Sequence, residues 1–186
     1  KRMRHYLKYM RLEGIEGVNR RYEEAVDVER MQINSTGRMK LELEQGGNVS
    51  SGVCRTTADY EEIEFPFYEE PVVSIVIPAY NEFDYTYNCL KSILKNSGDI
   101  AYEILIADDC STDTTKDVEK IARNVHSIKT SENVRFLLNC NHAAQYTKGK
   151  YILFLNNDTQ VQKNWLEPLV SLIERDEKIG MVGSKC

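Results

Sequence analysis

Three clusters of polar residues in this 186-residue sequence carry side chains suited to binding a charged ligand. The clusters are PAYNE at residues 78–82, DDCSTD at residues 108–113 and NNDT at residues 156–159. Their acidic members that matter most are Glu82, Asp108, Asp109 and Asp158. Like charges repel at short range, so carboxylates that folding brings together require a cation or the hydrogen-bond donors of a ligand.

The NNDT cluster has the ligand types of a site for a hard divalent cation. Asp158 offers a charged oxygen, and Asn156 offers a neutral amide oxygen two residues earlier. Hard cations prefer oxygen ligands, but two side chains are too few for a metal cage made of protein alone. The pattern favours Mg²⁺ or Mn²⁺ held mostly by the phosphates of a substrate and by water.

The other two clusters suit a nucleoside. An aspartate can accept a hydrogen bond from the N3–H group of uracil or from ribose hydroxyls, and Tyr80 can lie against a base. Taken alone, each cluster also has a simpler interpretation: NNDT as a turn and cap, DDCSTD as a helix cap, and PAYNE as a loop. Three such clusters in succession make these simpler interpretations weaker.

Other nucleotide and metal motifs do not fit the sequence. An EF-hand loop beginning at Asp109 would need Gly where Thr114 stands and Glu where Lys120 stands. Neither the P-loop pattern nor the G-x-G-x-x-G fingerprint occurs in the chain.

The segments around the clusters predict alternating strands and helices. Strands are expected at residues 72–78, 103–107, 134–138, 151–155 and 179–182. Helices are expected near residues 87–96, 113–123, 141–148 and 164–175. The alternation predicts an α/β fold with a mainly parallel sheet and helices on both faces. Parallel strands end at one edge, which is where such sheets bind ligands.

Residues 1–70 are predicted to form a helical N-terminal arm and a linker, and residues 71–186 the α/β domain. The turn-rich GGNVSSG at residues 46–52 marks the change of composition. Residues 1–40 hold ten Lys or Arg and six Asp or Glu, whereas the rest of the chain holds 14 and 23. This acidic remainder argues against nucleic acid as a partner. For the basic arm, a solvated helix is favoured over contact with an anionic membrane, and a helical arm would also allow homo-oligomers.

The composition indicates a soluble, globular protein. Hydrophobic residues make up 41% of the chain and charged residues 28%. No apolar run approaches the roughly 18 residues of a membrane span, and no secretory signal is recognised. The five cysteines are odd in number and lack C-x-x-C spacing, which favours reduced thiols. We expect a cytoplasmic protein, with peripheral contact at the inner face of a membrane as an open alternative.

Together, the clusters and the strands before them resemble the family 2 glycosyltransferases, which have the GT-A fold. VSIVIPAYNE, EILIADDCSTD and GKYILFLNNDT occur in the order and spacing of that family, and the resemblance covers about residues 72–186. It implies transfer of a sugar from a nucleotide-diphosphate donor, usually a UDP-sugar, with inversion at the anomeric carbon. The implied acceptor is a saccharide or a glycan of a glycoprotein or polysaccharide.

The resemblance also implies roles for individual residues. The implied donor-binding residues are Pro78, Ala79, Tyr80, Glu82, Asp108, Asp109, Asn141 and Asn157. Asp158, with Asn156, would hold the metal that bridges the two phosphates. Asn156 replaces the first Asp of the D-x-D motif of the family, which lowers the charge of the metal site. Ala143 and Arg135 stand where the family often has Gly, and Arg135 is interpreted as either a phosphate contact or an exposed side chain.

An inverting transfer needs a base that deprotonates the acceptor hydroxyl. In the family, this carboxylate and the acceptor half follow the D-x-D strand, and no residue of this chain matches it. The catalytic residue is therefore unassigned, and we expect a donor-binding portion that ends before the acceptor half. Two alternatives are a non-catalytic nucleotide-binding or assembly module and a sugar-nucleotide nucleotidyltransferase. PAYNEFDY lacks the Gly and basic residues that the second would use for a triphosphate.

Overall fold

The computed structural model describes residues 55–183 of the chain. The predicted arm at residues 1–45, its basic surface and its role in oligomers lie outside the described residues. The described residues belong to one compact unit. Among the described residues, no helix is long and apolar enough to cross a membrane.

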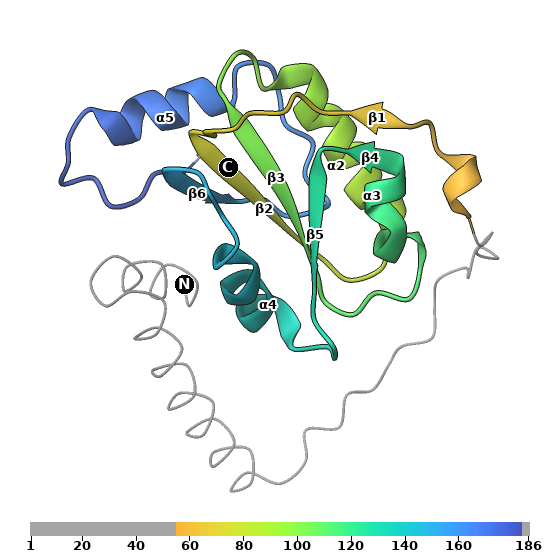
Figure 1. Cartoon of the computed structure of the whole chain (residues 1–186). Helices are drawn as coiled ribbons and strands as arrows, with labels where there is room; N and C mark the ends of the chain where they lie inside the picture. The colour runs from red at the N-terminus through yellow and green to blue at the C-terminus, as the bar shows by residue number, and fades with distance from the viewer. Residues whose placement is uncertain (1–54, 184–186) are drawn as a thin grey trace, which may run out of the picture. The chain divides into compact units, whose positions relative to one another are not determined.

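Four parallel strands form the central sheet, in the order β5-β3-β2-β6 (Figure 1). In chain order they are β2 (Val73–Ala79), β3 (Tyr102–Asp108), β5 (Val125–Lys129) and β6 (Tyr151–Phe154). A second, two-stranded parallel sheet joins β1 (Ile63–Glu64) to β4 (Ala122–Arg123). The α-helices are α2 (Phe83–Asn96), α3 (Val118–Ile121), α4 (Arg135–Ala144) and α5 (Leu166–Glu174), and the 3-10 helices are η1 (Thr57–Asp59) and η2 (Thr114–Asp117).

Helices cover both faces of the central sheet. Every residue of β2 is buried, and alternate side chains of a strand point to opposite faces, so this strand needs cover on both sides. Ile75 and Ile77 belong to the larger core cluster, with apolar residues of α2, α3 and α5. Val76 belongs to a smaller cluster, with Ala143 of α4. This arrangement confirms the predicted α/β class, with a mainly parallel sheet and helices on both faces.

The predicted strand at residues 134–138 is wrong. These residues begin α4, and the strand that follows β3 in the central sheet is β5. The apolar VRFLL suits either structure, but the carboxylate of Asp109 accepts hydrogen bonds from the backbone N–H groups of Val134 and Arg135 and so starts a helix there. The helix predicted at residues 141–148 is therefore the end of α4, which stops at Ala144.

Two further predictions need correction. The helix expected from Asp113 to Arg123 breaks into η2 and α3 and then enters β4. Residues 179–182 form no strand in the described part of the chain. The capping role of Asp113 is confirmed, because its side chain accepts a hydrogen bond from the backbone N–H of Thr115 at 2.9 Å.

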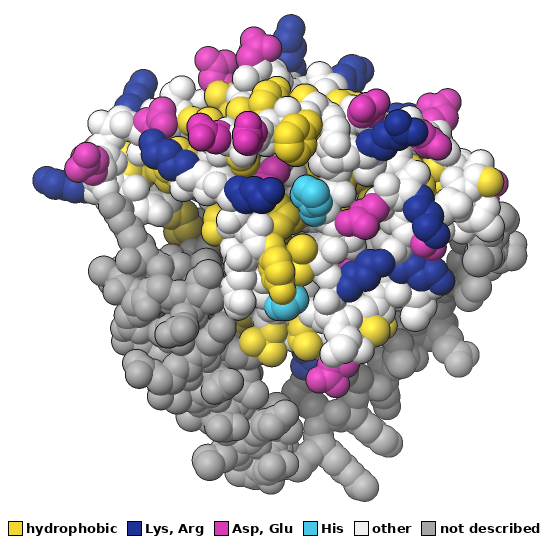
Figure 2. Space-filling view, viewed as in Figure 1, with side chains coloured by type: hydrophobic (Ala, Val, Ile, Leu, Met, Phe, Trp, Pro, Cys, Tyr) yellow, Lys and Arg dark blue, Asp and Glu magenta, His cyan; other side chains and the backbone are white. Residues whose placement is uncertain are grey.

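Residues 55–70, which the sequence assigned to the linker, pack against the α/β domain. Phe65 is 2% exposed and belongs to the larger core cluster. The ring of Tyr60 lies 4.8 Å from that of Phe83 and 4.9 Å from that of Tyr87. Acidic and basic side chains are interspersed over the described residues on the face shown in Figure 2.

Candidate functional site

The three polar clusters leave neighbouring strands at one edge of the central sheet. Ala79 pairs with Asp108 at the ends of β2 and β3. The backbone N–H of Leu155 donates to the carbonyl of Val76, which continues the β6 ladder one residue beyond the strand. Residues 80–82, 109–113 and 156–159 therefore begin beside one another at the carboxyl ends of the strands, where parallel sheets bind ligands.

Asn81 ties the PAYNE loop to the DDCSTD loop. Its side-chain oxygen accepts from the backbone N–H of Thr112 at 2.8 Å and from that of Asp113 at 3.3 Å. Its own backbone N–H donates to the Ser111 hydroxyl at 2.8 Å. The two loops are therefore held as one unit.

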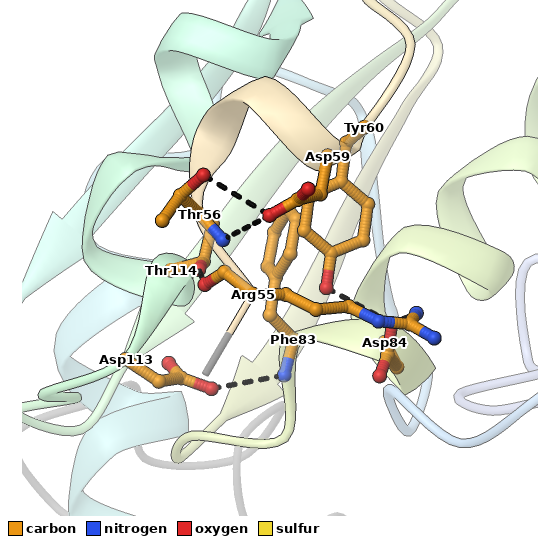
Figure 3. Close-up of polar contacts among 8 residues, drawn as sticks. All are labelled: Arg55, Thr56, Asp59, Tyr60, Phe83, Asp84, Asp113 and Thr114. Atoms are coloured by element: carbon orange, nitrogen blue, oxygen red, sulfur yellow. Dashed lines mark hydrogen bonds and ion pairs between the residues drawn. The ribbon is translucent and has the colours of Figure 1, made fainter. Parts of the chain in front are cut away.

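Asp113 fixes this unit to α2. One carboxylate oxygen of Asp113 accepts from the backbone N–H of Phe83 at 3.0 Å, at the start of that helix (Figure 3). Next to it, the Thr114 hydroxyl donates to the carbonyl of Arg55 at 2.7 Å. The guanidinium of Arg55 pairs with Asp84 on α2 at 2.5 Å. The segment before the sheet is thus bound to η2 and to α2, the elements that follow the two loops.

The NNDT turn also packs against α2. The side-chain amide of Asn157 donates to the Thr86 hydroxyl at 3.2 Å, and the Cys89 thiol lies 3.8 Å from the carbonyl of Asn156. The side chains of Asn156 and Asp158 are exposed. Asn157 is therefore engaged with the helix, whereas its two neighbours remain open to a ligand.

Asp108 and Asp109 are both buried but differ in their partners. Asp109 is 4% exposed, and both of its oxygens accept hydrogen bonds: one from Thr130 and Val134, and the other from Arg135. Asp108 is 1% exposed, and one oxygen accepts from the backbone N–H of Ser111 at 2.9 Å. Its second oxygen accepts no hydrogen bond from another described residue. Asp108 therefore retains a free acceptor for a ligand, while Asp109 holds the start of α4.

The remaining predicted donor residues differ in how accessible they are. Pro78 and Ala79 are buried at the end of β2, and Asn141 is buried in α4 with 4% of its surface exposed. Tyr80 is 53% exposed, and Glu82 is also exposed. Of these predicted residues, Tyr80 and Glu82 therefore present exposed side chains, whereas Pro78, Ala79 and Asn141 are buried.

The sequence did not single out Asn139, Asn81 or Asp113 as organisers of this site. Asn139 is 1% exposed and donates to the carbonyl of Ala107 at 2.6 Å, so it anchors α4 to the end of β3. The position of Asn and Asp residues next to strand ends was the only signal in the sequence for this role. It could not identify their partners, because these contacts join segments about 30 residues apart.

Strained backbone gathers at the same edge. Among the described residues, six other than glycine have positive φ angles, and four of them lie in or beside the clusters: Asn81, Glu82, Cys110 and Arg135. Left-handed backbone costs an ordinary residue about 1–2 kcal/mol. Such strain collects at functional sites, where the surrounding contacts maintain it.

A metal cage made by protein alone is absent from the described residues. No group of three or more His, Cys, Asp or Glu side chains in this part of the chain is arranged to hold an ion. Asn156 and Asp158 are exposed oxygen ligands on either side of the engaged Asn157. This donor set fits a hard cation that arrives with a diphosphate and takes its other ligands from phosphate and water.

Comparisons with known proteins find a family model and related sequences that match this chain. A family model described as Glycosyl transferase family 2 matches residues 74–185, which include all three clusters. One relative is TuaG of Bacillus subtilis (strain 168), which is named as a teichuronic acid biosynthesis glycosyltransferase. It is 34% identical over 119 residues, which cover 61% of this chain and 47% of TuaG.

Staphylococcus aureus (strain Mu50) TarS, named as a poly(ribitol-phosphate) beta-N-acetylglucosaminyltransferase, is 27% identical over 111 residues, or 54% of this chain and 18% of TarS. The crystal structure of S. aureus TarS 1–349 aligns with a TM-score of 0.48 and 28% identity, over 55% of this chain and 32% of that chain. The chain thus spans less than half of the length of these relatives. Since the family model matches more than half of its residues, the chain belongs to glycosyl transferase family 2.

Proposed function

We propose that this chain binds the donor of a glycosyl transfer, a nucleoside diphosphate sugar of the UDP type. The whole reaction passes the sugar to a hydroxyl of a saccharide or glycan, with inversion at the anomeric carbon. The observation that supports this most is the meeting of three polar clusters at the ends of adjacent strands, tied to one another and to α2. Membership of the family supports the transferase chemistry.

The nucleoside is proposed to lie over the ends of β2 and β3. Tyr80 is exposed enough to stack on a base, and Asp108 has a carboxylate oxygen free to accept from the N3–H of uracil. Glu82 is exposed beside them and can accept from the ribose hydroxyls. Because Asp109 already accepts three hydrogen bonds within the protein, we assign it to positioning the loop and α4.

The diphosphate is proposed to lie over the end of β6. Asp158 and Asn156 would hold Mn²⁺ or Mg²⁺ there, and such a cation neutralises the charge that develops on the departing diphosphate. Thr86 and Cys89 of α2 keep the turn in place through Asn157 and the Asn156 carbonyl. We assign no described residue as the base for the acceptor hydroxyl.

Calorimetric titration of UDP, with and without Mn²⁺, tests this proposal. We expect binding that is stronger with Mn²⁺, and we expect the Asp158→Ala variant to lose the benefit of Mn²⁺. Asp99→Ala is the matched control, because Asp99 is exposed and precedes β3 at the opposite edge of the sheet. Failure of the native chain to bind UDP would contradict the donor site. Equal Mn²⁺ dependence in Asp158→Ala would contradict the metal assignment.

A further inference from the structure

Two consecutive residues of the PAYNE cluster have left-handed backbone. Asn81 and Glu82 both have a φ of 57°, in the region that side chains other than glycine rarely adopt. Such a conformation persists only where the surrounding contacts maintain it. Asn81 is held by its bonds to the DDCSTD loop. The Glu82 side chain forms no hydrogen bond or ion pair with another described residue, so its conformation depends on the residues that follow it.

Tyr60 contacts both residues that follow Glu82 (Figure 3). Its hydroxyl donates to the carboxylate of Asp84 at 2.9 Å. Its ring packs edge-on against that of Phe83, with 4.8 Å between the ring centroids and 89° between the ring planes. Phe83 is 3% exposed, and its backbone N–H donates to Asp113 at 3.0 Å. The start of α2 is therefore fixed from two sides, and Tyr60 supplies one of them.

The segment that carries Tyr60 lies before residues 74–185, which the family model matches. It is fastened on both sides of Tyr60. Arg55 pairs at 2.5 Å with the same Asp84 oxygen that accepts from the Tyr60 hydroxyl, and Phe65 is 2% exposed in the larger core cluster. Hydrogen bonds to a charged carboxylate are stronger than those between neutral groups. The conformation of Glu82 is therefore supported by a segment outside all three polar clusters.

We propose that Tyr60 is a positioning residue for donor binding, an inference that rests on the proposed function above. By holding Phe83 and Asp84, Tyr60 keeps Glu82 in the left-handed conformation in which its carboxylate accepts from the ribose hydroxyls. Tyr60 acts through Glu82 and does not itself contact the donor. The sequence could not single it out, because Tyr60 and Asp84 are 24 residues apart and the contact between them is made by folding.

Calorimetric titration of UDP against Tyr60→Phe tests this role. The variant keeps the ring and loses the hydroxyl, so it should fold, and its affinity for UDP should fall about threefold to tenfold. In a Glu82→Ala background, Tyr60→Phe should change the affinity by less than about twofold, because Tyr60 acts through Glu82. Tyr87→Phe is the matched control and should bind UDP like the native chain. It also loses a hydroxyl that joins this segment to α2, but that hydroxyl donates to the carbonyl of Glu61 at 3.1 Å.

Amide hydrogen exchange without UDP separates this inference from the proposed function. The backbone N–H groups of Phe83 and Tyr85 donate to Asp113 and to the carbonyl of Glu82, so they report on the turn. Both should exchange faster in Tyr60→Phe than in the native chain or in Tyr87→Phe.

Three results would overturn the positioning role and leave the donor site standing. They are unchanged exchange in Tyr60→Phe, an equal loss of UDP affinity with and without Glu82, and a Glu82→Ala variant that binds UDP like the native chain. If the native chain binds no UDP, the proposed function itself fails, and the positioning role fails with it.

Discussion

At the scale of single residues, the two adjacent aspartates of DDCSTD have separate tasks. In Asp109→Asn, an amide group replaces one carboxylate oxygen, and an amide N–H cannot accept from the Val134 and Arg135 backbone as the carboxylate does. We expect this variant to lose about 1–3 kcal/mol of unfolding free energy, measured by urea denaturation.

Asp108→Asn serves as the comparison. Its amide oxygen can still accept from the backbone N–H of Ser111, so its stability should change by less than half as much. Its affinity for UDP should fall. The single amide oxygen is needed for the Ser111 contact, and the NH₂ group that replaces the other oxygen cannot accept a hydrogen bond from uracil. Equal stability of Asp109→Asn and the native chain would contradict the positioning role of Asp109.

The raised pKa values of two buried thiols lead us to expect a loss of stability at alkaline pH. Burial, with a smaller contribution from Asp158, raises the pKa of Cys89 from 9.0 to about 12, and burial, with Asp109, does the same for Cys140. Above pH 9 the unfolded thiols ionise while the folded ones stay neutral, so the stabilisation present below pH 9 is lost as the pH rises towards 12. At pH 10 the expected loss is about 1–2 kcal/mol per thiol.

Urea denaturation at pH 7.5 and pH 10 measures this loss. The double variant Cys89→Ala/Cys140→Ala should start less stable, because it loses buried volume, but its stability should fall less between the two pH values. An identical fall in both proteins would show that these thiols are not the cause.

At the scale of the elements, Gly149 governs how β6 enters the sheet. A Cβ atom there would lie 2.6 Å from the backbone nitrogen of Ser74 in β2, and the Gly149 N–H donates to the Ser74 hydroxyl at 2.8 Å. Gly149→Ala must therefore displace one strand from the other. We expect a loss of about 1–3 kcal/mol in urea denaturation.

The control for this substitution is Gly183→Ala, where an added Cβ would meet nothing within 4 Å. Its stability should stay within about 0.5 kcal/mol of the native chain. If both variants were equally stable, the close approach of Gly149 to β2 would not limit the stability of the sheet.

The sequence predicted the elements best where local pattern alone decides the structure. The runs that became β2, β3 and β6 are apolar and are followed by polar clusters, and these strands form within one or two residues of their expected ends. Residues 134–138 failed because VRFLL fits either a strand or a helix. The decisive contact comes from Asp109, 25 residues earlier in the chain.

The same distinction holds for the candidate site. The meeting of the three clusters follows from parallel topology, so the sequence could predict it. In these clusters both oxygens of Asp109 and the amide of Asn157 are engaged, one oxygen of the buried Asp108 lacks a partner among the described residues, and Asp158 is exposed. This division depends on long-range hydrogen bonds to α4 and α2. No local pattern carries that information. The roles of these residues towards a donor remain predictions.

At the scale of the whole molecule, α2 joins the parts of the proposed donor site. Asp113 binds its first residue, Asn157 binds Thr86 one turn later, and Arg55 binds Asp84 from the preceding segment. The nucleoside and diphosphate ends of the proposed site are therefore both hydrogen-bonded to the same helix. The chain spans 47% of the length of TuaG, and our proposal for it concerns the binding of the donor.

The most direct test of this account is the broadening of backbone amide NMR signals by substoichiometric Mn²⁺, with Mg²⁺ as the diamagnetic control. In the presence of UDP, we expect Mn²⁺ to broaden the signals of residues 156–159 most, those of residues 80–82 and 108–111 next, and those of residues 98–101 at the opposite edge least. Without UDP, the same amount of Mn²⁺ should have little effect, because the protein alone supplies too few ligands. Broadening centred elsewhere, or broadening that UDP does not change, would contradict a metal–diphosphate site at the ends of β2, β3 and β6.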